Sequence, residues 1–182
     1  VRPELADAFS SGDPRYLIYE GTFTNDLNDI GDWGLTGSGY MCIKYSYASE
    51  DDYDNTQGVY YNTFSNTDFP LFRLADTYLM LAECQLRGVE CNGKYYFDQV
   101  RARASQPAIE LNDYNLLQER MRELYWEGHR RSDLIRFGQY SGNQYLWSWK
   151  GGVQQGQSVP AYREVYAIPT NYTATLGQNP GY

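Results

Sequence analysis

The stretch that decides the fold of this chain runs from Glu119 to Gly138 and reads ERMRELYWEGHRRSDLIRFG. Acidic and basic side chains recur at spacings of three and four residues, which places them next to one another on a helix surface. Gly128 is expected to end this helix, and a second helix should start through Ser132 and Asp133. The stretch therefore predicts two consecutive amphipathic helices rich in charged pairs.

Two further helices are predicted ahead of this stretch. The first spans Leu71–Arg87, where apolar residues occur on nearly all sides, and that pattern is typical of a buried helix. Gly88 fits its C-terminal end. The second spans Lys94–Ala104 and carries its apolar residues on one face. Because only a short connection separates them, we expect the two helices to form a hairpin in the centre of the domain.

The helix of the opening stretch should begin at Asp113, whose carboxylate is a suitable N-terminal cap. Its apolar residues are expected to be buried, and they are Leu117, Met121, Leu124 and Tyr125. Beyond the break at Gly128, the core should continue through Leu134, Ile135 and Phe137.

The remaining segments give weaker signals. Residues 2–12 indicate a short helix that a turn at Asp13-Pro14 follows. Apolar and polar residues alternate over Tyr40–Tyr47, which predicts a strand, and Gln57–Phe64 is its candidate partner. Residues 138–160 form a long glycine-rich loop, and a terminal strand is expected over Arg163–Ile168.

Together these segments predict a mainly α fold with irregular loops and a few short strands. At 182 residues the chain is long enough for one domain with a substantial core. Within it we expect residues 1–68 to be rich in loops and strands, 69–137 to form the helical core, and 138–182 to form an aromatic, glycine-rich loop and a C-terminal tail.

The net charge of −8 is unevenly distributed, since residues 1–68 carry 12 acids against 3 bases. An acidic first third repels phosphate backbones, and there is no basic stripe elsewhere, which argues against nucleic acid as a partner. There is no run of eighteen apolar residues that would span a membrane. Most of the bases are arginines, which form planar pairs with carboxylates, so an ion-pair network among the helices is expected.

Three motifs, in order along the chain, resemble those of the SusD-like (RagB/SusD) family. They are Phe69–Glu83, the pattern ER-x-x-EL-x-x-EGHR-x-x-DLIR-x-G from Glu119 to Gly138, and Arg163–Pro169 followed by Gln178–Tyr182. The resemblance implies the C-terminal portion of a SusD-like α-helical scaffold related to tetratricopeptide repeats. The family's helical-repeat N-terminal half would then lie outside this chain.

Members of that family are lipoproteins at the cell surface, on the outer membrane, where they capture nutrients for a SusC-like TonB-dependent transporter. The resemblance therefore implies non-catalytic binding of oligosaccharides as part of polysaccharide utilization. It also implies that a lipid anchor outside this chain holds the intact protein on the outer membrane.

Aromatic residues make up 16% of the chain, and nineteen of them are tyrosines. Tyr and Trp have a flat apolar face and a polar edge, so the C–H face of a pyranose ring can stack on them. The candidate ligand-binding residues are Trp33, Tyr40, Tyr45, Tyr47, Tyr53, Tyr60, Trp147 and Trp149. Because the last two alternate on a glycine-flanked loop, at least one of their indoles should face outward. The alternative for each candidate is packing in the core or over its edge.

The same charged stretch invites a catalytic interpretation, because Glu119, Glu123 and Glu127 share one helical face at the spacing of a glycosidase carboxylate pair. Nearby arginines would keep these acids ionised and unsuited to proton donation at neutral pH. We therefore expect a structural ion-pair network made of Glu119, Arg120, Glu123, Glu127, Arg130, Arg131, Asp133 and Arg136.

Cofactor and metal sites have little support. His129 is the only histidine, and there is no nucleotide-binding motif. Residues 50–55 offer oxygen ligands for calcium but lack the glycine and final glutamate of an EF-hand loop, so a solvated acidic turn is the alternative. Cys84 and Cys91 are close enough in sequence to form a disulfide, although packing of Cys84 as a small apolar residue is favoured.

Four functions remain open at this point. They are glycan capture, capture of a peptide or another nutrient, glycan hydrolysis, and a purely structural role in a transporter complex. A peptide groove would favour exposed carboxylates and edge strands, whereas a hydrolase needs two unpaired acids facing a cleft.

Overall fold

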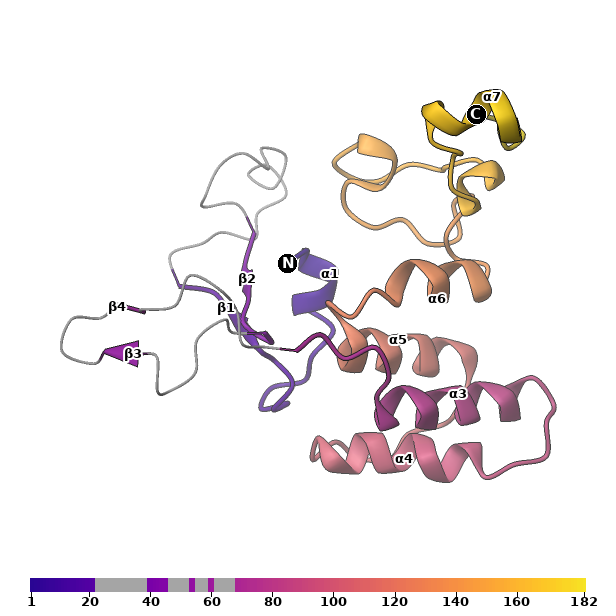
Figure 1. The fold of residues 1–182 in the computed structure, drawn as a ribbon. Helices are drawn as coiled ribbons and strands as arrows, with labels where there is room; N and C mark the ends of the chain where they lie inside the picture. The colour runs from indigo at the N-terminus through magenta and orange to yellow at the C-terminus, as the bar shows by residue number, and fades with distance from the viewer. Residues whose placement is uncertain (22–38, 46–52, 55–58, 61–67) are drawn as a thin grey trace. The chain divides into compact units, whose positions relative to one another are not determined.

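The computed structural model describes residues 1–21, 39–45, 53–54, 59–60 and 68–182. These residues divide into two compact units, Val1–His129 and Arg130–Tyr182. Helices dominate them and the strands are short, so the prediction of a mainly α fold with a few short strands is confirmed (Figure 1). The expected organisation as one domain with three segments stays a prediction.

The first unit is built around three helices: α3 (Leu74–Leu86), α4 (Gly93–Arg103) and α5 (Asp113–Leu124). Helix α3 packs against both others, which confirms the predicted hairpin of α3 and α4 (Figure 1). Their close approach requires Gly93, because a Cβ there would lie 2.5 Å from the carbonyl oxygen of Leu81. The buried apolar side chains of the three helices are Leu79, Ala82, Phe97, Val100, Leu116, Leu117, Met121 and Leu124.

The helix ends follow from local sequence. Gly88 has a φ of 89° and ends α3 as predicted, with the amide of Val89 donating to the Cys84 carbonyl at 2.9 Å. Helix α5 is capped by Asn112, whose Oδ1 accepts from the Asn115 amide at 2.8 Å. The prediction of Asp113 as the cap was therefore wrong by one residue.

The prediction that α3 is buried on all sides is also wrong. Leu71 and Phe72 precede the helix and are 75% and 94% exposed, and Leu74 and Met80 on the helix are exposed as well. Helices α4 and α5 cover only the side of α3 that carries Leu79 and Ala82. The apolar pattern of α3 thus includes residues on an exposed surface, which no described helix or strand covers.

The cysteines are free, so the considered disulfide between Cys84 and Cys91 is absent. Cys84 is exposed on the outer side of α3, which contradicts its expected packing as a small apolar residue. Cys91 donates instead to the carbonyl of Leu81 at 3.4 Å.

The start of the chain is less regular than predicted. Helix α1 is the single turn Pro3–Ala6, shorter than the expected 2–12. Strand β1 (Ile18–Tyr19) pairs antiparallel with β2 (Met41–Cys42), and β3 (Tyr53–Asp54) pairs with β4 (Val59–Tyr60). The expected pairing of Tyr40–Tyr47 with Gln57–Phe64 is therefore wrong in the described residues. Most of the considered calcium segment, 50–55, lies outside them.

The second unit begins with α6 (Arg130–Arg136) and ends with α7 (Thr173–Leu176). Ser132 and Asp133 lie inside α6, so the prediction that this helix starts through them is wrong. Between the two helices the chain forms 3-10 turns at Lys150–Gly152, Ala161–Glu164 and Thr170–Tyr172. The second of these occupies part of the expected strand Arg163–Ile168, so that prediction is also wrong.

Candidate functional site

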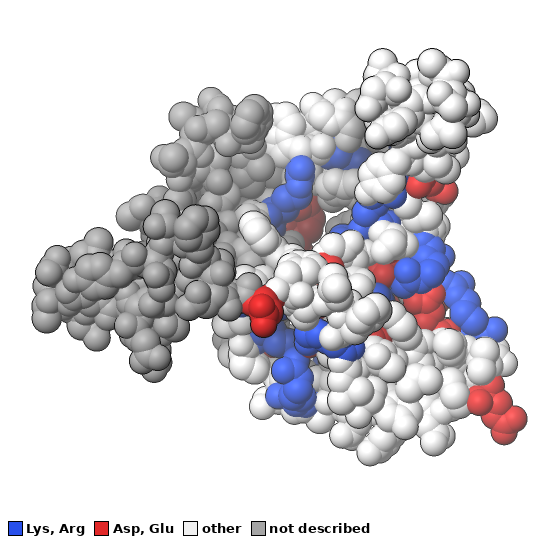
Figure 2. Space-filling model, in the orientation of Figure 1, with Lys and Arg blue, Asp and Glu red and all other residues white. Residues whose placement is uncertain are grey.

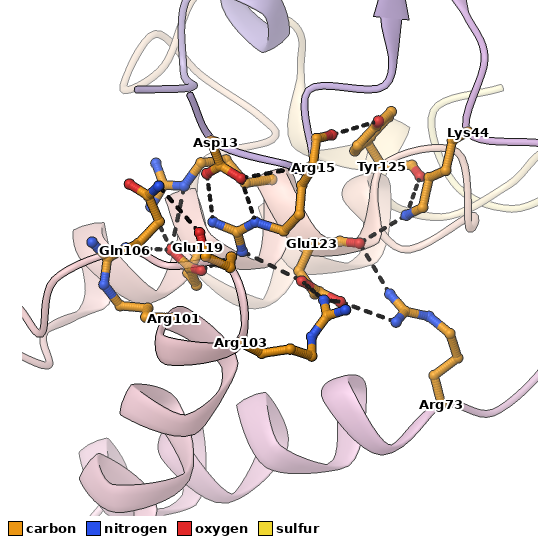
Figure 3. A network of polar contacts seen from close by, with 12 residues as sticks. Asp13, Arg15, Lys44, Arg73, Arg101, Arg103, Gln106, Glu119, Glu123 and Tyr125 are labelled. Carbon is orange, nitrogen blue, oxygen red and sulfur yellow. Dashed lines mark hydrogen bonds and ion pairs between the residues drawn. The ribbon is translucent and has the colours of Figure 1, made fainter. Parts of the chain in front are cut away.

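The acids of α5 are enclosed by bases from distant parts of the first unit (Figure 3). Glu119 is fully buried, and its Oε1 lies 2.5 Å from Nη1 of Arg15. Its Oε2 lies 2.6 Å from Nη1 of Arg101 and 2.6 Å from Nη2 of Arg122. One carboxylate is thus shared by three guanidinium groups, each from a different segment of the chain.

Glu123 and Glu127 extend this cluster toward the end of α5. Glu123 pairs with Arg73 at 3.0 Å and with Arg103 at 2.7 Å. Glu127 pairs with Nε of Arg73 at 2.7 Å and with the ammonium of Lys44. We call the set Asp13, Arg15, Lys44, Arg73, Arg101, Arg103, Glu119, Arg122, Glu123 and Glu127 the charge cluster. In Figure 2, side chains of both signs lie beside one another on the visible face.

The other residues expected in an ion-pair network have different partners. Arg120 pairs with Asp76 of α3 at 2.9 Å, and Arg136 pairs with Asp133 inside α6 at 2.8 Å. Arg131 donates to backbone carbonyls of its own unit. The bases that neutralise the α5 acids come mainly from outside the opening stretch, where its sequence could not reveal them.

The electrostatics of the charge cluster suit scaffolding. Burial alone would raise the pKa of Glu119, but the attraction of Arg15 and Arg122 outweighs it, so the pKa is lowered. Burial would likewise raise the pKa of Glu127, but the hydrogen bonds and positive charges of Arg73 and Lys44 outweigh it. The pKa of Glu127 is therefore also lowered. Carboxyl groups with lowered pKa values are ionised at neutral pH and are poor proton donors. The surroundings of Glu119 and Glu127 therefore favour structural ion pairing over proton transfer.

Trp126 follows the end of α5 and is an aromatic residue that was not among the sequence-predicted candidates. Tyr125 is anchored, because its hydroxyl donates to the Arg15 carbonyl at 2.9 Å and accepts from the Leu17 amide at 3.2 Å. Glu127 is anchored by the charge cluster. Trp126 between them has a φ of 63° and a side chain that is 62% exposed. A tryptophan in this left-handed conformation is strained. The only sequence signal for this turn was the position of Trp126 just before Glu127-Gly128.

In the second unit, aromatic rings and one guanidinium form a continuous series. The ring centroid of Trp147 lies 5.6 Å from that of Tyr145 and 5.8 Å from that of Tyr140. The guanidinium of Arg131 lies 5.0 Å from the Tyr140 centroid and 3.9 Å from that of Tyr166. We call Tyr145, Trp147, Tyr140, Arg131 and Tyr166 the aromatic row. Tyr166 is its most exposed tyrosine, at 71%.

Lys150 fixes the loop that carries most of the row. Its ammonium is buried, donates to the carbonyls of Gly142 and Tyr145 at 3.0 and 2.7 Å, and lies 4.6 Å from the Trp147 ring centroid. Burial lowers the pKa of this ammonium. Gly156 allows the loop to close, because a Cβ there would lie 2.5 Å from the Trp147 carbonyl.

The structure corrects one expectation for the two loop tryptophans. Trp147 and Trp149 are both half-buried, so neither indole is fully exposed, and Leu146 is the exposed side chain beside them. Trp149 has a φ of 65°, and its indole nitrogen is buried without a hydrogen-bond partner among the described residues. The turn around Lys150 draws both rings inward.

The other candidate residues lie in the first unit or outside the described residues. Tyr40 and Tyr45 are half-buried, and the Tyr45 ring lies 6.2 Å from that of Phe69. Tyr53 and Tyr60 are register partners in the β3–β4 ladder. Trp33 and Tyr47 fall outside the described residues. Their roles in ligand binding stay predictions.

The described residues contain neither a metal-ligand cluster nor a helix able to span a membrane. No group of His, Cys, Asp and Glu side chains there has an arrangement that could hold a metal ion. None of the helices there combines the length and the apolar character that crossing a membrane requires.

Comparison with known proteins gives consistent matches. The sequence model of the SusD family matches residues 19–182. Starch-binding protein SusD of Bacteroides thetaiotaomicron is 36% identical over 179 residues, which cover 95% of this chain and 32% of that protein. A SusD-like protein of Formosa agariphila is 44% identical over 79 residues, covering 37% of this chain and 15% of that protein. This chain therefore spans at most about a third of the length of these relatives.

Solved structures of two other proteins have a similar fold. A laminarin-binding SusD-like protein is 28% identical, with a TM-score of 0.68 over 99% of this chain and 37% of that one. The fold of surface glycan-binding protein A from Bacteroides thetaiotaomicron is also similar, with a TM-score of 0.67, 23% identity, and coverage of 99% of this chain and 41% of that one.

Proposed function

This chain belongs to the SusD family, and from that premise we propose that it binds glycans at the cell surface without performing chemistry on them. The intact protein would be held at the outer membrane by a lipid anchor. It would pass the captured oligosaccharide to a SusC-like TonB-dependent transporter. The relatives named for starch, laminarin and surface glycans support the ligand class.

The observation that carries the proposal is the aromatic row. Its rings supply flat apolar faces for the C–H faces of sugars, while phenol and guanidinium groups supply hydrogen bonds to hydroxyls. The loop is held in place by Lys150, so little ordering would be needed when a ligand binds. Tyr166, the most exposed tyrosine of the row, is the residue that we expect to contact the sugar first.

The absence of catalysis rests on the charge cluster. Glu119, Glu123 and Glu127 are buried and ion-paired, so a substrate could reach them only by disrupting the cluster. Release of reducing ends from a polysaccharide panel would refute this part of the proposal.

The test is binding of the full-length protein to an array of oligosaccharides and peptides, with two matched variants. Tyr166→Ala removes the exposed ring of the row, and Tyr114→Ala removes a ring on α5 with the same exposure of 71%. We expect Tyr166→Ala to lower glycan affinity by about 1 kcal/mol or more, roughly fivefold, and Tyr114→Ala to have no effect.

The outcomes separate the alternatives. Equal effects of the two variants would remove the aromatic row from the binding site. Binding of peptides alone would replace glycan by peptide as the cargo. Absence of binding to both oligosaccharides and peptides would favour a structural role. Capture of the transporter by the intact protein would then test that role.

A further inference from the structure

The two units carry opposite net charge. Residues 130–182 contain 5 bases and 2 acids, a net charge of +3, so residues 1–129 carry −11 of the total of −8. Both acids of the second unit are engaged. Asp133 pairs with Arg136 at 2.8 Å, and Glu164 accepts from the Ser141 hydroxyl at 2.5 Å.

Arg131 is held without a carboxylate among the described residues. Its Nη2 donates to the backbone carbonyls of Arg163 and Glu164 at 2.8 and 3.0 Å, and its guanidinium stacks on Tyr166. Aromatic faces and carbonyl oxygens orient the group, and within the described ranges no carboxylate neutralises its charge. In the charge cluster, by contrast, each arginine has at least one carboxylate partner.

Arg163 is a second cation of the same kind. It is exposed, and its guanidinium lies 5.4 Å from the Tyr162 ring centroid and 5.8 Å from that of Tyr182. The described residues offer it no ion pair either. Because Arg131 donates to the Arg163 carbonyl, the two arginines belong to one small region of the second unit.

We propose that the aromatic row and Arg163 bind a glycan that carries anionic groups, either carboxylates or sulfates, and the proposal rests on the glycan-binding function above. The planar guanidinium fork matches the two oxygens of such a group, and stacking on tyrosine holds the fork ready. A neutral sugar would need hydroxyl contacts only, for which uncompensated cations are not required. The net charge of +3 on residues 130–182 attracts an anionic group to this unit, whereas the −11 on residues 1–129 opposes long-range approach of an anionic chain.

The test compares matched pairs of glycans on the full-length protein by calorimetry at low and high salt. One arm uses polygalacturonate and its carboxyl-reduced form, and the other uses a sulfated galactan and its desulfated form. We expect at least tenfold tighter binding of the anionic member in one or both arms, and the arm that shows it identifies the group. Raising NaCl from 50 to 500 mM should remove most of this preference, since screening weakens charge attraction.

Three variants assign the preference to residues. Arg163→Gln should lower affinity for the anionic glycan about tenfold and affinity for its neutral form less than twofold. Arg131→Lys, which keeps the charge but loses the fork, should show a smaller loss in the same direction. Arg103→Gln, at an exposed arginine of the first unit, is the control and should change neither. Thermal melts of each variant check that the fold is retained.

Two results would overturn the inference while leaving glycan binding intact. One is equal affinity for both members of each pair, and the other is an anionic preference that is as large in Arg163→Gln and in Arg131→Lys as in the unmodified protein. Failure of every glycan to bind would instead remove the proposed function as well.

Discussion

Replacement of Arg15 by methionine should cost more stability than loss of any exposed arginine of the charge cluster. The Arg15 side chain is 8% exposed and contacts three carboxylates: Asp13 at 2.8 Å, Glu119 at 2.5 Å and Glu123 at 3.3 Å. Glu119 and Glu123 keep other arginines when it is removed. Asp13 is also buried, and of the hydrogen bonds that Arg15 donates to its carboxylate, the one from the backbone amide of residue 15 remains, with Arg122 attracting it from farther away.

The expected loss follows from this buried carboxylate, which would be left without an ion-pair partner in direct contact. Removing one partner of a buried ion pair costs about 3–5 kcal/mol, out of a total of roughly 5–15 kcal/mol for a typical domain. For a chain of this size the melting temperature should fall by roughly 6 to 20 °C. The control is Arg103→Met, because that side chain is 61% exposed and Glu123 keeps two other bases, so about 1 kcal/mol or less is expected.

Urea unfolding followed by circular dichroism measures both variants. The double variant Asp13→Asn, Arg15→Met should recover part of the loss, because it removes the stranded charge. The reasoning would be refuted if Arg15→Met and Arg103→Met lost equal stability within error, or if the double variant were no more stable than Arg15→Met alone.

Three further outcomes are expected. Asn112→Ala should destabilise by about 1 kcal/mol in urea unfolding, because the Asn115 amide loses its cap; no loss would show that water replaces it. Trp126→Gly should keep stability or raise it by up to about 1 kcal/mol, because glycine relieves the strain at a φ of 63°; a clear loss would show that packing of the indole outweighs the strain. Folding lowers the pKa values of Glu119 and Glu127 below their ordinary value of 4.5. The stability that these two carboxylates contribute is therefore complete above pH 4.5 and is lost as the pH falls from 4.5 toward their folded-state pKa values. Thermal melts recorded from pH 7 to 3 would contradict this if the melting temperature did not decline in acid.

Sequence periodicity predicted the helices of the first unit well, because each helix repeats its own local pattern. The buried residues Leu117, Met121, Leu124 and Tyr125 all follow from the spacing on α5. The same local logic failed for α3. Apolar residues on every side cannot reveal whether a partner is present on every side, and Leu74 and Met80 are exposed.

The candidate site was less predictable for a related reason. Charged residues three and four apart predicted pairs within one helix, and Glu119 does pair with Arg122. The same carboxylate also binds Arg15, 104 residues away in the chain, which no local spacing could indicate. Arg131 on α6 contacts the rings of Tyr140 and Tyr166, which lie 9 and 35 residues later in the chain. Local sequence patterns do not predict where the chain after α6 folds back onto that helix. Composition indicated an aromatic surface but not which rings form it.

The charge cluster also sets an order of events during synthesis. Glu119 and Glu123 lie on α5 and Glu127 lies three residues beyond it, and all bases of the cluster except Arg122 come earlier in the chain. At about 5–20 residues per second, roughly 5–20 s separate translation of Arg15 from that of Glu119, 104 residues later. During this interval the bases Arg15, Lys44 and Arg73 exist without their α5 partners, and the first unit cannot complete its interior. A nascent chain arrested before α5 should therefore remain sensitive to protease, and release of the last turn of that helix should be the step that protects it.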